Sequence, residues 1–167
     1  MRILGVDPGL QCTGWAVIVE DNLQFRVVEA GVIRTRAQDA PEIRLQEIHL
    51  GLAQVIEELK PQVAVVEELY SHYRHPRTAI LMGHARGVIF LAAAEMGLPV
   101  KSYSATRIKK ALTGSGRASK HQVQRTIQSE LGLDRLPEPD DVADALAVAL
   151  SHAHTLNWKY SERRKHR

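Results

Sequence analysis

The chain has 167 residues and a net charge of +3, with 44 % hydrophobic and 25 % charged residues. This length suits one domain rather than two, and this composition excludes a disordered or collagen-like chain. The single cysteine, Cys12, excludes an internal disulfide, and no uninterrupted apolar run is long enough to indicate a membrane span or a secretory leader. We therefore expect a folded cytoplasmic domain that does not contact a membrane.

The positive charge is concentrated in two segments. Residues 101–125 carry seven Lys or Arg and no acid, and residues 159–167 carry five Lys or Arg and one acid. Such segments suit a phosphate backbone, although for the first a solvated helix face explains the charge equally well. We expect one domain over residues 1–156, followed by a flexible basic tail over residues 157–167.

The first part of the chain has the pattern of three strands and a helix. Residues 2–7 are apolar and stop at a Pro-Gly turn, and residues 14–20 and 24–35 are rich in β-branched and aromatic side chains on either side of a polar pair. A proline followed by apolar residues at nearly helical spacing predicts a helix over residues 41–59.

The rest of the chain alternates between strands and helices. Short apolar segments at 63–66 and 99–103 predict two strands, of which the first is typical of a strand buried on both faces in a parallel sheet. Residues 78–96, apolar on more than one face, predict a helix in a core or an interface. Two shorter helices follow the N-caps Ser104 and Ser119, and a last helix runs from about residue 139 to 154. The predicted fold class is α/β, a mixed five-stranded sheet sandwiched by helices.

Four carboxylates stand where structure alone does not require them. Asp7 and Glu67 each follow a buried strand, so both reach the same edge of the sheet if those strands are parallel neighbours. Asp141 and Asp144 share one face of the last helix. A turn explains Asp7 equally well and an N-cap explains Asp141, but Asp144 lies in an apolar run, where an unpaired carboxylate is costly.

These four carboxylates favour a particular chemistry. Hard oxygen donors without a matching set of Cys and His favour Mg²⁺ or Mn²⁺ over zinc. Two such ions, about 4 Å apart, can clamp the attacking and leaving oxygens of a phosphodiester displacement. Acids for metal ions, combined with a basic segment for DNA, predict a nuclease.

Five motifs, in unbroken order, also carry a family resemblance. They are DPGLQCTGWAVI (7–18), VVEELY (65–70), GHARGV (83–88), RIKKALTGSGRASKHQV (107–123) and DDVADALAVALSHAH (140–154). Together they resemble the RuvC family of Holliday-junction resolvases over nearly the whole chain. The resemblance implies an RNase H-like fold and a homodimer that makes paired metal-dependent nicks in opposite strands of four-way junction DNA during recombination and repair. It further implies cooperation with a junction-binding protein and a hexameric branch-migration motor.

The resemblance also implies roles for single residues. The catalytic metal ligands, for two Mg²⁺ or Mn²⁺ ions, fall on Asp7, Glu67, Asp141 and Asp144. Glu68 and Asp140 stand next to two of these ligands and leave the assignment open at both places.

The expected DNA contacts come from loops and from the basic segment. The residues are Tyr70, Tyr73, Arg77, Lys109, Arg117 and Lys120. In the family, basic residues that match Lys109 and Lys120 lie near the scissile phosphate. Tyr70 matches an aromatic that wedges into the junction and stacks on an unpaired base, although a tyrosine packed on the sheet edge fits the pattern too. Tyr73 competes for that role, and Arg86 is a further candidate for a backbone contact.

Histidines and the cysteine fit a structural role better than a chemical one. The spacing of His72, His75 and His84 matches no zinc site, so we expect these side chains at the surface or against phosphate. We expect His152 and His154 to be structural, and Cys12 to be a small buried side chain.

Three other functions remain open on the residues alone. A non-catalytic junction-binding module predicts broken acidic positions, and here all four are carboxylates. An RNase H-like nuclease acting on RNA–DNA hybrid has the same acids, so only its substrate distinguishes it. An actin-like nucleotide-binding protein requires two such domains, for which the chain is too short.

Overall fold

The computed structural model describes the backbone of residues 1–21, 24–69 and 76–165 and the side chains of residues 1–21, 24–69 and 77–156. The elements, in chain order, are β1 (Arg2–Asp7), β2 (Cys12–Asp21), β3 (Gln24–Arg34), α1 (Pro41–Leu59), β4 (Val63–Glu67), α2 (Pro76–Glu95), β5 (Val100–Tyr103), α3 (Ala105–Thr113), α4 (Lys120–Leu131) and α5 (Asp140–Lys165).

The strands form one mixed sheet in the order β3-β2-β1-β4-β5. β2 pairs antiparallel with both β1 and β3, as expected for strands that only four and two residues separate along the chain. β4 pairs parallel with β1 and with β5, each time after a crossover through a helix. The expected five-stranded mixed sheet between helices is confirmed.

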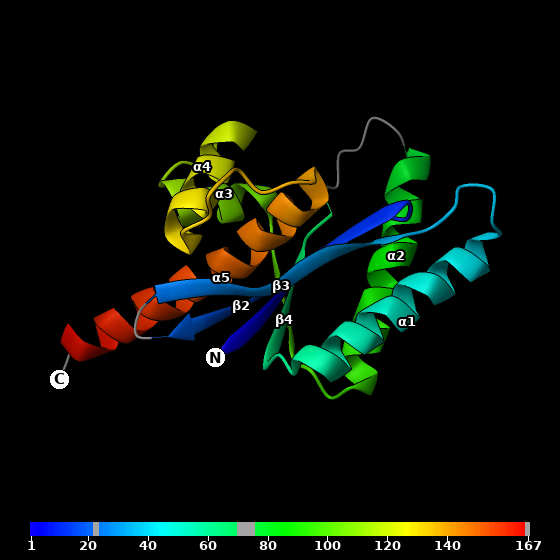
Figure 1. The fold of residues 1–167 in the computed structure, drawn as a ribbon, viewed down its shortest axis with the longest axis horizontal. Helices are drawn as coiled ribbons and strands as arrows, with labels where there is room; N and C mark the ends of the chain where they lie inside the picture. The colour runs from blue at the N-terminus through cyan, green and yellow to red at the C-terminus, as the bar shows by residue number, and fades with distance from the viewer. Residues whose placement is uncertain (22–23, 70–75, 166–167) are drawn as a thin grey trace.

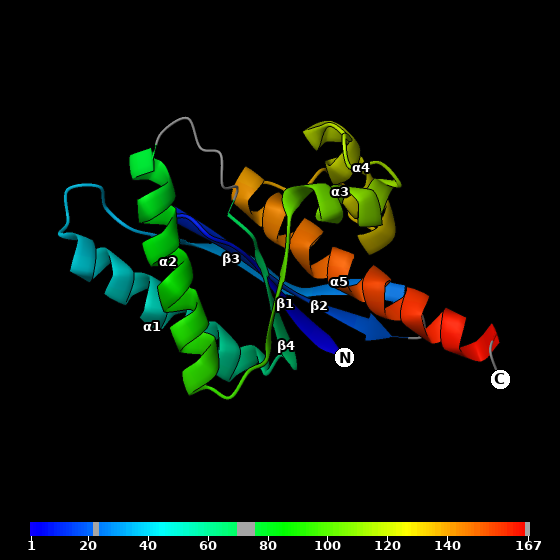
Figure 2. The same cartoon turned by 180° about the vertical axis from the view of Figure 1, so that it is seen from behind.

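Helices cover both faces of the sheet (Figure 1, Figure 2). α1 and α2 lie on one face, and α3, α4 and α5 lie on the other, so the molecule has two hydrophobic cores. Strand alternation divides the apolar residues between these cores: Ile3 packs under α5 and Leu4 under α1, and likewise Val65 and Val66 face opposite ways. By the same period of two, Asp7 and Glu67 emerge on the α5 face.

α5 lies directly on β1 and β2 because two glycines leave room for its backbone. A Cβ atom at Gly5 would come within 2.1 Å of the Ala145 carbonyl oxygen, and one at Gly14 within 2.0 Å of the Asp141 carbonyl oxygen. Real Cβ atoms never approach so closely, so any larger residue at either position would displace the helix. The close approach places the first turn of α5 beside the end of β1.

The helix boundaries follow the sequence signals, with one difference. Ser104 and Ser119 cap α3 and α4, the latter in a full capping box with Gln122, as expected. The last helix, however, does not stop near residue 154 but continues as α5 to Lys165. Residues 140–165 contain no glycine or proline to end a helix, and basic residues are favourable at a helix C-terminus. The expected flexibility of residues 157–167 stays a prediction.

α2 is less enclosed than an apolar helix usually is. Within the part of the chain that the structure describes, one helix segment, residues 77–95, is long and apolar enough to cross a membrane. A core helix of a water-soluble protein can have the same length and composition, so this property alone does not indicate a membrane span. In the structure, 22 % of the segment is buried. Its inner side packs Ala85, Ile89 and Ala92 against the sheet, while Ile80 and Leu91 are exposed. The prediction that this helix belongs to a core or an interface is therefore confirmed for its inner side, which lies in the core.

Candidate active site

The ends of β1 and β4 bring the first two carboxylates together. These strands are parallel neighbours in a register that pairs Val6 with Val66, so the next residues, Asp7 and Glu67, follow side by side at the carboxyl edge of the sheet. This is the topology on which the expectation for these two residues depended. Ligands bind at this edge in many open α/β sheets.

The start of α5 adds the other two carboxylates. Gly14 pairs with Asp7 across β1 and β2 and also contacts the backbone of Asp141, so the first turn of α5 sits beside the end of β1. Asp144 lies one turn further along the same face of the helix. Three elements that are far apart in sequence thus deliver four acids to one place.

The protonation of Asp7 and Glu67 reflects this crowding. Burial, and then the charges of Glu67, Asp144 and Asp141, raise the pKa of Asp7 from 3.8 to about 7. The pKa of Glu67 is also raised, first by burial and then by the charge of Asp144. Both shifts mean that the metal-free site holds more negative charge than it can stabilise, which is the condition that a divalent cation relieves.

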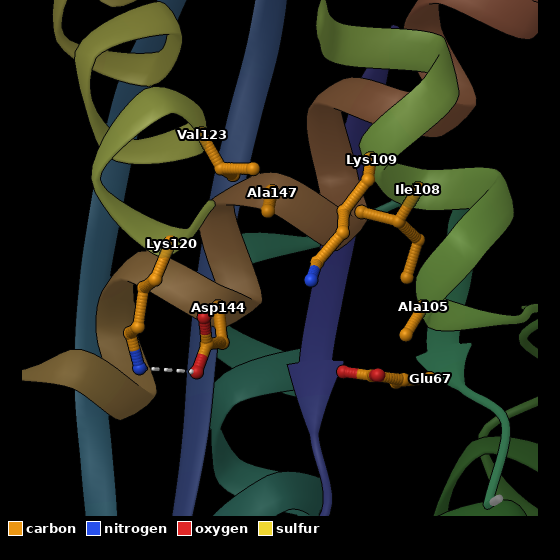
Figure 3. Close-up of a pocket in the computed structure, with 8 residues that line it drawn as sticks. All are labelled: Glu67, Ala105, Ile108, Lys109, Lys120, Val123, Asp144 and Ala147. Atoms are coloured by element: carbon orange, nitrogen blue, oxygen red, sulfur yellow. Dashed lines mark hydrogen bonds and ion pairs between the residues drawn. The ribbon is translucent and has the colours of Figure 1, made fainter. Parts of the chain in front are cut away.

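Two lysines and two of the four carboxylates, Glu67 and Asp144, line a cavity of about 270 Å³ (Figure 3). Lys120, the first residue of α4, places its Nζ atom 3.0 Å from Oδ2 of Asp144 and 3.2 Å from Oδ2 of Asp140. Lys109 extends from α3 into the same cavity, where its charge lowers the pKa of Glu67. The cavity therefore combines acids that can hold cations with ammonium groups that can hold a phosphate.

The donor set fits hard divalent ions such as Mg²⁺ or Mn²⁺, because every candidate ligand is a carboxylate. Among the described residues, no three His, Cys, Asp or Glu side chains stand close enough together to form a complete metal site. Asp144 instead faces Lys120, as Figure 3 shows. Ligation by three or more of the carboxylates thus requires side-chain rotation, and the metal-ligand assignment stays a prediction.

The structure places Glu68 and Asp140, the acidic neighbours of Glu67 and Asp141, in different surroundings. Glu68 lies on the other face of the sheet, where its charge acts on Arg86. Asp140 faces α4, where it accepts a hydrogen bond of 3.3 Å from Gln124 in addition to its ion pair with Lys120. The strand period therefore separates Glu68 from Glu67. Asp140, in contrast, shares the Lys120 ammonium group with Asp144, so the choice between Asp140 and Asp141 stays a prediction.

Of the other predicted DNA contacts, two lie among the described residues and two do not. Arg77, at the start of α2, and Arg117, between α3 and α4, are both exposed. The α2 start and the α5 start lie at the same end of the molecule in both ribbon views (Figure 1, Figure 2). Tyr70 and Tyr73 lie outside the described residues, as do His72 and His75.

Two residues have surroundings that the sequence did not indicate. Arg86, a candidate for a contact with the DNA backbone, donates from its guanidinium to the Glu67 carbonyl oxygen and the Ser102 hydroxyl, and its contact with DNA stays a prediction. Cys12 was expected to be a small buried side chain, but it is only partly buried, and burial together with a hydrogen bond to Asp141 raises its pKa to about 11. No local pattern signals either position, because the contacts of Arg86 and of Cys12 join elements that are far apart in the chain.

The histidines of α5 are structural, as expected. The buried His152 ring pairs through Nδ1 with the Tyr103 hydroxyl at 2.7 Å. His154 pairs with Glu130 of α4 at 2.6 Å and stacks on Phe25 of β3. Both residues tie α5 to its neighbours away from the four carboxylates.

Comparison with known proteins places this geometry in a family. The model of the family "Crossover junction endodeoxyribonuclease RuvC" matches residues 3–152. The chain belongs to the RuvC family. The RuvC protein of Rhodopirellula baltica is 51 % identical over 93 % of this chain and 87 % of its own length, and that of Moorella thermoacetica is 46 % identical over 98 % and 97 %.

Solved RuvC structures share the fold as well as the sequence. The structure of Thermus thermophilus RuvC in complex with Holliday junction substrate superposes with a TM-score of 0.90 at 35 % identity, over 95 % of this chain and 96 % of that one. The resemblance read from the motifs and the RNase H-like fold are thereby confirmed. Membership of a RuvC nuclease family and an all-carboxylate donor set both indicate dependence on a divalent metal ion.

Proposed function

We propose that this protein resolves four-way DNA junctions by hydrolysing one phosphodiester bond in each of two opposite strands, using divalent ions held by the four carboxylates. The observation that carries the proposal is the convergence of Asp7, Glu67 and the first turns of α5, beside a cavity that Glu67 and Asp144 line together with two lysines. Family membership supports it, as does the related Thermus protein, whose structure was solved with a Holliday junction.

The metal ions are Mg²⁺ or Mn²⁺, two in each active site, with ligands from Asp7, Glu67, Asp141 and Asp144. When bound, such ions polarise the scissile phosphate and lower the pKa of a water molecule at the site. The raised pKa of Asp7 supports this assignment, because a buried carboxylate among like charges becomes a stable anion only when a cation is present.

The lysines act on the phosphate rather than on the metal ions. Lys109 and Lys120 project from two different helices into the cavity, so they can approach a phosphodiester group from two sides (Figure 3). Ammonium groups fixed in this way neutralise the charge that develops on the phosphate oxygens in the transition state. Ion pairs with Asp140 and Asp144 hold the Lys120 ammonium group at the cavity.

The DNA follows the exposed basic residues around this cavity. Arg117 and Lys120 belong to the loop and helix start between α3 and α4, and Arg77 begins α2. Each of these side chains is exposed. Contacts with the backbone from several elements position a branched substrate without reading its base sequence.

The active form is a homodimer in which α2 of one subunit packs against α2 of the other. The outer side of α2 presents Ile80, Gly87 and Leu91. Gly87 has no neighbouring atom within 4 Å of where its Cβ atom would lie, so a second helix can approach closely there. A two-fold axis at this face gives each subunit one strand to cut.

The proposal includes two further parts, which rest on the family resemblance alone. The protein cooperates with a junction-binding protein and a hexameric branch-migration motor, and it acts in the cytoplasm.

The test is cleavage of a labelled synthetic four-way junction in Mg²⁺ or Mn²⁺ by the unchanged chain and by Asp7→Asn. We expect symmetrical nicks in the junction, and at least about a 100-fold loss of cleavage in the variant with little loss of binding, because the substitution removes charge and nearly preserves shape. Linear duplex and RNA–DNA hybrid serve as control substrates.

Two results would contradict the proposal. Tight junction binding without cleavage in either metal would identify a non-catalytic binding module. Preferential cleavage of the hybrid would identify an RNase H-like enzyme with a different substrate.

A further inference from the structure

Arg86 lies on α2, on the opposite face of the sheet from the four carboxylates. It is neither exposed nor part of the metal site, and the proposed mechanism gives it no role. Burial lowers its pKa, against the charge of Glu68, so the fold retains a partly desolvated cation at this position. Such a group is costly unless it makes specific contacts.

The contacts of Arg86 converge on the end of β4. Its Nε donates to the carbonyl oxygen of Glu67 at 3.2 Å, and its Nη2 donates to the Ser102 hydroxyl of β5 at 2.8 Å. The guanidinium also lies 4.4 Å from the centre of the Phe90 ring, which supports its flat face. One rigid group thus joins α2 to the last residue of β4 and to the neighbouring strand.

The main chain after Glu67 is held from the β5 side as well. The amide of Glu68 donates to the Tyr103 carbonyl oxygen at 2.9 Å, and Tyr103 pairs with Glu67 in the sheet register. β4 ends at Glu67. The peptide between Glu67 and Glu68 is therefore fixed through its carbonyl oxygen by Arg86 and through its amide by Tyr103.

We propose that Arg86 is a positioning residue for Glu67: it fixes the peptide that follows Glu67 and so sets where the Glu67 carboxylate meets a metal ion. The inference rests on the proposed function, because it takes Glu67 to be a ligand. Groups that orient metal ligands typically contribute about 10- to 100-fold to metal affinity or activity. Since Arg86 belongs to α2, the geometry of the metal site depends on how α2 is seated on the sheet.

The test uses Arg86→Met, which keeps an unbranched side chain against Phe90 and removes both hydrogen-bond donors. Mn²⁺ binding is measured without DNA by electron paramagnetic resonance, and single-turnover junction cleavage is measured across Mn²⁺ concentrations. We expect Mn²⁺ affinity and the cleavage rate each to fall by about 10- to 100-fold, with junction binding in chelator unchanged within about twofold. Arg86→Lys should recover part of the loss, because one donor remains.

Two further variants separate positioning from general stability. Ser102→Ala removes only the hydroxyl that accepts the hydrogen bond from Arg86 Nη2. It should weaken Mn²⁺ binding, but by less than Arg86→Met does. Arg26→Met removes an exposed arginine that pairs with Asp21 at the far end of the sheet and should change nothing.

The inference is overturned if Arg86→Met binds Mn²⁺ as tightly as the unchanged chain. It is equally overturned if junction binding in chelator falls as much as cleavage does, because Arg86 would then be a DNA contact. If the unchanged chain binds Mn²⁺ but cuts no junction, the proposed function fails, while the Mn²⁺ measurements still decide the role of Arg86.

Discussion

At the scale of single residues, the chemistry of the site is set by the face on which each side chain emerges. Glu67 and Glu68 are chemically equivalent and adjacent, yet only Glu67 continues the row of Val63 and Val65 toward α5. Glu68 points to the other layer and to Arg86. A period of two in a single strand thus decides which of two glutamates can serve as a metal ligand.

The raised pKa of Asp7 predicts that the metal site destabilises the metal-free protein. A carboxylate with a pKa of about 7 in the folded chain and about 3.8 in the unfolded chain binds its proton more tightly when folded. The free energy of unfolding therefore falls as the pH rises from about 4 to 7. Asp7→Asn should raise it by about 2 kcal/mol at pH 8 in chelator, and by much less near pH 4.

Urea unfolding at the two pH values checks this prediction. Asp134→Asn, at an exposed position between α4 and α5, is the matched control and should change stability little at either pH. Equal or lower stability of Asp7→Asn at pH 8 would mean that Asp7 is not strained by its neighbours.

At the scale of elements, the active site is the product of one close contact between α5 and the sheet. Gly5 and Gly14 remove the Cβ atoms that would separate the helix from β1 and β2. Gly14 pairs with Asp7 in the sheet and also contacts the backbone of Asp141. The size of residue 14 therefore sets the distance between Asp7 and Asp141. Neither glycine carries a functional group, and both are part of the site.

Gly14→Ala should therefore damage the active site as well as the fold. Overlap with the Asp141 carbonyl oxygen should lower the free energy of unfolding by about 1 to 3 kcal/mol. The displaced first turn of α5 should also raise the Mn²⁺ concentration required for half-maximal cleavage, by about tenfold. Urea unfolding and a Mn²⁺ titration of junction cleavage measure the two effects.

Gly83→Ala in α2 is the control for this variant, because its new Cβ atom would meet only the Leu69 side chain, at an ordinary 3.9 Å. It should be neutral or should stabilise the helix by about 0.5 to 1 kcal/mol. A Gly14→Ala protein as stable and as active as the control would show that α5 can move aside without consequence.

At the scale of the whole molecule, two layers of helices serve two purposes. α3, α4 and α5 lie on one face of the sheet and α2 lies on the other (Figure 2). The first layer lines the cavity, whereas α2 leaves an apolar side exposed. Arg86 connects the two layers through the end of β4. The surface proposed to join the subunits therefore belongs to the same helix that holds the Glu67 main chain.

A charge on the exposed side of α2 should break the dimer. Leu91→Glu, at a side chain that is 50 % exposed, should raise the dimer dissociation constant by about 100-fold or more, because an isolated carboxylate in an apolar interface is poorly solvated. Leu50→Glu, at a 59 % exposed position of α1, is the matched control and should leave the dimer intact. Sedimentation velocity and the ratio of paired to single nicks are the measurements.

The dimer proposal fails if the unchanged chain is a monomer at micromolar concentration with full paired cleavage. Dissociation by both variants alike would place the interface elsewhere on the surface.

Much of this protein could be predicted from local pattern. The strands at residues 2–7 and 63–67 and the capped starts of α3 and α4 follow from the local signals for strands and caps, which depend on near neighbours only. The last helix runs past the predicted end near residue 154 to Lys165, because no glycine or proline interrupts it there. Asp7 and Glu67 were identified because both follow buried strands.

The sequence by itself determined the chemical inventory: carboxylates for metal ions, lysines for phosphate, and an apolar helix with more than one apolar side. Tertiary structure decided which of these groups meet. Glu67 rather than Glu68 faces the cavity, Arg86 donates a hydrogen bond to the Glu67 carbonyl oxygen, and Gly14 sets the place of Asp141. The physical reason is that such pairings depend on strand register and on the approach of elements far apart in the chain, which no local pattern specifies.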